Sequence, residues 1–85
     1  METFNRPHAQ ERTLARSRAI AAAGNFAVLM GRYRDAQMHA EESLAIAREI
    51  GDKGRVAMML QLMGIALSEQ GDRAAALGYF EESLA

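Results

Sequence analysis

The sequence predicts an all-α fold in which about four helices form two antiparallel helical hairpins, stacked as a short solenoid. Three observations predict it: a repeat with a period of forty residues, glycines at matching places in each repeat, and apolar side chains at helical spacing without strand-like alternation. The chain has 85 residues, of which 49% are hydrophobic, and no cysteine. This length fits one small domain that neither a disulfide nor a thiolate metal site stabilises.

The internal repeat matches at glycines, at small residues and at a short phrase. The pairs that match at a spacing of forty are Gly24 with Gly64, Gly31 with Gly71, Ala36 with Ala76, and residues 41–45 with 81–85, which read EESLA in both copies. Stacked repeats need equivalent geometry at such positions. We therefore expect a single domain over residues 1–85, with a first repeat at about 14–53 and a second, truncated repeat at about 54–85.

Turn residues and capping residues divide the chain into its elements. The predicted helices cover about 8–30, 33–50, 54–70 and 73–84. Pro7 suits a first helical position, so the first helix is expected to begin near it. Asp35 favours the first turn of the second helix. Residues 51–54 (GDKG) stop that helix and supply an Asp cap for the third, and residues 71–72 (GD) separate the third helix from the fourth.

Apolar side chains are distributed differently on successive helices. The second helix has one apolar stripe, formed by Ala36, Ala40, Leu44 and Ala47, and the fourth helix is expected to behave similarly. The third helix is apolar on most sides between Val56 and Leu67, which indicates packing against several neighbours. Alternation of sandwiched and half-exposed helices is typical of a helical solenoid, in which the first helix of each pair lines the inner surface.

The two repeats resemble the tetratricopeptide repeat over residues 14–85. The first copy carries the motif residues Gly24, Gly31, Tyr33 and Ala36, and the second carries Gly64, Gly71, Ala76 and Phe80. The period of forty and the phrase EESLAIAREIGDKG are similar to the longer variant found in kinesin light chains and bacterial signal-transduction regulators. Arg73 and Ala40 depart from the motif, since they stand where the other copy has an aromatic residue. The resemblance implies a protein- or peptide-binding scaffold, as a fragment of a larger bacterial regulator or adaptor.

The resemblance also implies an inner groove formed by one face of the first and third helices. The predicted partner-binding residues are Arg18, Ala22, Asn25, Val28, Leu29, Met58, Gln61, Leu62, Ile65, Ser68 and Glu69. This mostly apolar face suits an amphipathic helix or an extended apolar peptide. Met58 is either a groove residue or a core residue, whereas core filling is favoured for Met59 and Met63. Asn25 resembles the residue with which some tetratricopeptide domains hold a carboxylate, but Ala21, Gln61 and Ile65 supply no cation beside it, so we expect no such clamp. Asn25 either bonds a partner's backbone or, as is favoured, is a polar residue satisfied within the helix pair.

The fourth helix lacks the polar cap expected at the end of a solenoid. The first repeat continues beyond Ala45, whereas the second stops at Ala85. We therefore expect either a fragment of a longer array or self-association as a homodimer or higher oligomer.

The charge of the chain is distributed unevenly: residues 1–34 hold six Arg and two Glu (+4), and residues 35–85 hold four basic and nine acidic side chains (−5). Such ends favour an acidic partner or head-to-tail association, with ordinary solvated helix faces as the alternative.

No residue pattern in the sequence predicts catalysis, so we expect no enzyme, no cofactor and no metal site. His8 and His39 lie on different predicted helices without a ligand at metal-binding spacing, and both are expected to face solvent. The acidic pairs at 41–42 and 81–82 lie on polar helix sides. The arginines form no aromatic-interleaved basic stripe, which argues against nucleic acid, and no run is long and apolar enough for a membrane. A cytoplasmic location is expected.

Overall fold

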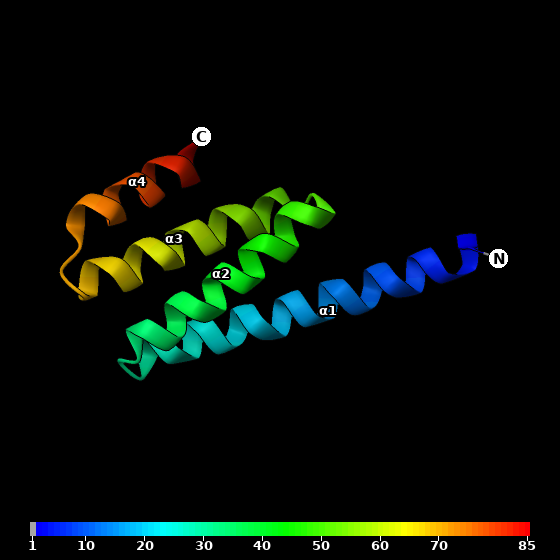
Figure 1. The fold of residues 1–85 in the computed structure, drawn as a ribbon, viewed down its shortest axis with the longest axis horizontal. Helices are drawn as coiled ribbons and strands as arrows, with labels where there is room; N and C mark the ends of the chain where they lie inside the picture. Colours follow the sequence, from blue (N-terminus) through cyan, green and yellow to red (C-terminus); the bar gives the residue numbers. More distant parts are fainter. Residues whose placement is uncertain (1) are drawn as a thin grey trace.

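The structure is a computed structural model that describes the backbone of residues 2–85 and the side chains of residues 12–85. Its helices are α1 (Glu2–Leu29), α2 (Tyr33–Ile50), α3 (Lys53–Glu69) and α4 (Arg73–Leu84). They lie side by side in one layer, and each runs antiparallel to the one before it (Figure 1). The layer measures 50 × 28 × 13 Å. The all-α prediction is confirmed, and the predicted bounds of the last three helices agree with the structure to within one residue.

The start of the first helix was predicted wrongly. α1 begins at Glu2, whereas the position of Pro7 suggested a start near residue 8. Pro7 lies in the second turn, where its missing N–H removes one intrahelical hydrogen bond without ending the helix. The N-terminal part of α1 consequently runs on past the end of α2 (Figure 1). The expectation for the His8 side chain lies outside the described residues.

The three turns between the helices share one backbone conformation. Each contains a glycine with positive φ, at Gly31 (75°), Gly51 (73°) and Gly71 (91°). This left-handed conformation strains residues that have a Cβ atom, which explains the repeat of glycine at these places. The caps that follow differ: Asp52 Oδ1 accepts a hydrogen bond from the Arg55 backbone N–H and Asp72 Oδ1 from that of Ala75, each at 3.1 Å. Arg32, at the same position before α2, makes no capping hydrogen bond.

The core lies along the two inner helices of the layer. α2 packs against α1 and α3, and α3 packs against α2 and α4. The predicted stripe of α2 is buried in full, at Ala36, Ala40, Leu44 and Ala47. The buried residues of α3 are Met59, Leu60, Leu62, Met63, Gly64 and Ala66. The small residues of α2 allow close packing on both sides, whereas α4, among the helices that the structure describes, contacts only α3 and buries only Ala76 fully.

Close contacts between helices explain why both repeats carry a glycine at the equivalent positions Gly24 and Gly64. A Cβ atom on Gly24 would lie 2.8 Å from Leu62 Cδ2, and one on Gly64 would lie 2.6 Å from Phe80 Cε1. Both distances are shorter than carbon–carbon contacts allow. Each glycine therefore leaves space for a bulky side chain from a neighbouring helix.

A buried pair of serines joins α1 to α2. The Ser43 hydroxyl donates to the Ser17 carbonyl oxygen at 3.1 Å, and the two hydroxyl oxygens are 3.2 Å apart. The second hairpin has Ala57 where the first has Ser17, so Ser83, the counterpart of Ser43, instead donates to the Phe80 carbonyl within its own helix. The two hairpins thus share their geometry but not this polar contact.

Candidate functional site

The predicted residues of α1 form an exposed strip along one side of the helix. Arg18, Ala22, Asn25 and Leu29 are all exposed and recur every three or four residues. Val28 is half-buried and packs against the core. This strip therefore presents one charged, one amide and two apolar side chains to solvent.

The predicted residues of α3 form a second exposed strip, with one exception. Met58, Gln61, Ile65, Ser68 and Glu69 are exposed. Leu62 is only 4% exposed, which contradicts its predicted place in the groove. Its side chain instead reaches toward Gly24 of α1. Met58 is 49% exposed and therefore does not fill the core, whereas Met59 and Met63 are core residues as favoured.

The two strips lie on the same side of the layer. Arg18 and Met58 are one repeat apart, as are Asn25 and Ile65, so each pair occupies equivalent places in the stack. α1 and α3 also contact each other directly. We call the exposed residues of both strips together the α1–α3 face. It is more polar than the sequence indicated, because Leu62 is withdrawn into the core.

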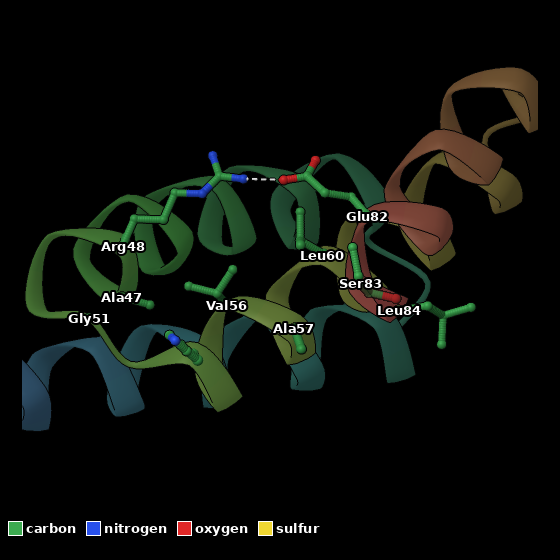
Figure 2. Close-up of a pocket in the computed structure, with 11 residues that line it drawn as sticks. Ala47, Arg48, Gly51, Val56, Ala57, Leu60, Glu82, Ser83 and Leu84 are labelled. Carbon is green, nitrogen blue, oxygen red and sulfur yellow. Dashed lines mark hydrogen bonds and ion pairs between the residues drawn. The ribbon is translucent and has the colours of Figure 1, made fainter.

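A cleft of about 530 Å³ lies elsewhere, between the end of α2, the start of α3 and the end of α4. Figure 2 shows Arg48 and Glu82 paired across one side of it, with Val56 and Ala57 opposite. On the α4 side the cleft is lined by residues 82–85. Sequence reasoning did not find this cleft.

The two end helices carry further exposed apolar side chains that the sequence analysis did not single out. They are Phe26 and Met30 beside the end of α1, and Leu77 and Leu84 on α4. Phe26 and Met30 border a hollow of about 290 Å³, which His39 also lines. His39 is half-buried there rather than fully solvent-facing as expected. These surfaces could have been predicted from the sequence by comparing each residue with its counterpart forty positions away.

The described side chains offer little that resembles a reactive centre. Within residues 12–85, no three His, Cys, Asp or Glu residues lie close enough to hold a metal ion together. Glu42 and Glu82 form ion pairs with Arg16 and Arg48, respectively. Over the helical part that the structure describes, no helix combines the length and the apolar character needed to cross a membrane.

Comparison with known proteins yields one match. The family model described as tetratricopeptide repeat matches residues 10–85 and thus covers both hairpins. Neither a curated protein nor a solved structure matches the chain significantly.

Proposed function

Because the chain belongs to the tetratricopeptide repeat family, whose members generally serve as protein-interaction scaffolds, we propose that it binds a protein or peptide on the α1–α3 face. The observation that supports this face is the exposure of Leu29, Met58 and Ile65 on α1 and α3, two helices that contact each other. Exposed apolar side chains set among polar ones are typical of a recognition surface.

The chemistry of the face favours a short segment with apolar anchors. Leu29, Met58 and Ile65 can receive apolar side chains, and the flexible thioether of Met58 adapts to different shapes. Asn25 and Gln61 lie exposed between them and can donate to and accept from a peptide backbone. An amphipathic helix or an extended apolar peptide meets both requirements.

A peptide selection followed by calorimetry tests the proposal. A random peptide library is selected on the purified chain, and the affinity of an enriched peptide is measured for the wild type, Met58→Glu and Ile65→Glu. We expect each variant to weaken binding at least about tenfold, because a charge replaces an apolar anchor at the centre of the contact.

The matched control is Met38→Glu, which changes an exposed methionine on α2, away from the α1–α3 face. This variant should bind the selected peptide as the wild type does. Equal affinity of the peptide for Met58→Glu, Ile65→Glu and the wild type would contradict the proposed site, and failure to enrich any peptide would contradict peptide binding itself.

Self-association is a second candidate function. Leu77 and Leu84 favour it, since they leave α4 with an apolar face that no other helix covers within residues 2–85. The two candidates use different surfaces, so a chain that associates through its end helices keeps its α1–α3 face free for a partner.

A further inference from the structure

We propose that copies of this chain associate head to tail, with α4 of one copy packed against α1 of the next. The proposal rests on the second candidate function, self-association. It names the two surfaces that meet and the direction in which the copies join. The tail face consists of Leu77 and Leu84 on α4. The head face consists of Ala19, Ala23, Phe26 and Met30, which recur on α1 and the turn after it at intervals of three or four.

The contact between α2 and α3 supplies the template for this junction. In the repeat, α4 is the counterpart of α2 and α1 is the counterpart of α3. At the template contact, Leu44 of α2 shares one core cluster with Met59 and Met63 of α3. A copy whose α1 rests on α4 as α3 rests on α2 would therefore continue the order of helices in the stack.

The residues at the two ends fit this continuation. Gln70 Nε2 donates to Gln37 Oε1 at 3.1 Å in the template contact. The counterpart of Gln37 on the tail face is Leu77, and the counterpart of Gln70 on the head face is Met30. Both members of the polar pair are thus replaced by apolar residues, each 58% exposed.

Leu84 gives the clearest contrast between the template and the tail face. Its counterpart Leu44 is 7% exposed between α2 and α3, whereas Leu84 is 84% exposed. The same side chain at the same place in the repeat is therefore buried where a following helix exists. α1 of a second copy would cover Leu84 with Ala19 and Ala23 in place of Met59 and Met63.

Some side chains on the head face are smaller than their counterparts at the template contact, and one is larger. Ala19 and Ala23 replace Met59 and Met63, whereas Phe26 replaces Ala66. Phe26 therefore sets the helices of the junction further apart, and the hollow of about 290 Å³ beside Phe26 and Met30 offers room for a side chain from α4. Leu77, as the counterpart of Gln37, is placed to enter this hollow.

Charge complementarity favours a second copy as the occupant. Between residues 12 and 34 the chain has five arginines and no acidic residue. Between residues 69 and 85 it has four acidic residues, Glu69, Asp72, Glu81 and Glu82, against the single Arg73. A positive head and a negative tail attract each other and steer unlike ends together. Because the two faces differ, repeated association produces open chains rather than closed dimers.

Complementation between two blocked variants tests the polarity. The tail variant carries Leu77→Glu and Leu84→Glu, the head variant carries Phe26→Glu and Met30→Glu, and Met38→Glu is the matched surface control. Sedimentation velocity at several concentrations should show the wild type and the control growing beyond dimers, while each blocked variant alone stays monomeric. An equimolar mixture of the blocked variants should form one-to-one dimers and nothing larger, because one intact head and one intact tail remain.

Other outcomes separate this proposal from self-association in general. If the head variant alone still dimerises and mixing adds nothing, the contact is a symmetric one between α4 helices, and the head-to-tail proposal falls while self-association stands. A wild type that is monomeric at every concentration overturns both. Circular dichroism confirms that each variant is folded, and Met30→Glu and Leu84→Glu singly carry the same test if a double variant unfolds.

Discussion

Gly64 and Gly78 lie on two helices that pack together, but a methyl group would meet different surroundings at each. A Cβ atom on Gly64 would lie within 2.9 Å of three ring atoms of Phe80. A Cβ atom on Gly78 would have no neighbour within 4 Å. Replacing each glycine with alanine therefore separates two effects. The substitution at Gly64 measures the cost of overpacking, and the substitution at Gly78 measures the ordinary preference of a helix for alanine.

We expect Gly64→Ala to lower the free energy of unfolding by roughly 1–3 kcal/mol, because the whole Phe80 ring must move. Gly78→Ala should raise it by about 0.5–1 kcal/mol, since alanine loses less backbone entropy within a helix. Urea unfolding followed by circular dichroism measures both. Equal effects of the two substitutions would show that α3 and α4 do not pack as closely as the structure has them.

The buried serine pair predicts an asymmetry between its two members. Ser43→Ala removes the donor to the Ser17 carbonyl and leaves the Ser17 hydroxyl without this partner, which should cost about 1–3 kcal/mol. Ser17→Ala keeps the bond to the backbone carbonyl and should cost about 0.5–1.5 kcal/mol. Thermal unfolding of both single variants and the double variant measures these costs. Strictly additive effects would contradict a shared hydrogen-bond network.

At the scale of the element, the start of α2 differs from the starts of α3 and α4. Asp52 and Asp72 cap their helices, whereas Arg32 occupies the corresponding position without a capping bond. Arg32→Asp should therefore raise the free energy of unfolding by about 0.5–2 kcal/mol, while Asp72→Ala should lower it by a similar amount. Urea midpoints at constant slope provide the measurement, and a destabilising Arg32→Asp would mean that the arginine has another structural role.

The sequence predicted the elements where the signals are local. Gly51 with Asp52 and Gly71 with Asp72 mark turns because positive φ and capping depend only on neighbouring residues. The start of α1 was missed because Pro7 is compatible with more than one place near a helix start. Among the predicted groove residues, Val28 is half-buried and Leu62 is buried. The burial of Leu62 depends on how closely α1 and α3 approach each other at Gly24, which cannot be read from helical spacing.

At the scale of the whole molecule, the α1–α3 face and the two end faces have distinct residues and distinct neighbours. The first lies along one side of the stack, and the head and tail faces lie at its two ends. Peptide binding and head-to-tail association can therefore occur on the same copy.

Head-to-tail association also predicts how stability depends on protein concentration. Contacts made only by folded copies shift the unfolding equilibrium toward the folded state, so the melting temperature of the wild type should rise with concentration. Salt should reduce this rise, because the attraction between a basic head and an acidic tail is screened over about 10 Å at 0.1 M. Differential scanning calorimetry at a series of concentrations, at low and high salt, measures both effects. Phe26→Glu should remove the concentration dependence and Met38→Glu should keep it, and a wild-type melting temperature that stays constant over the series would mean that folded copies do not meet through these faces.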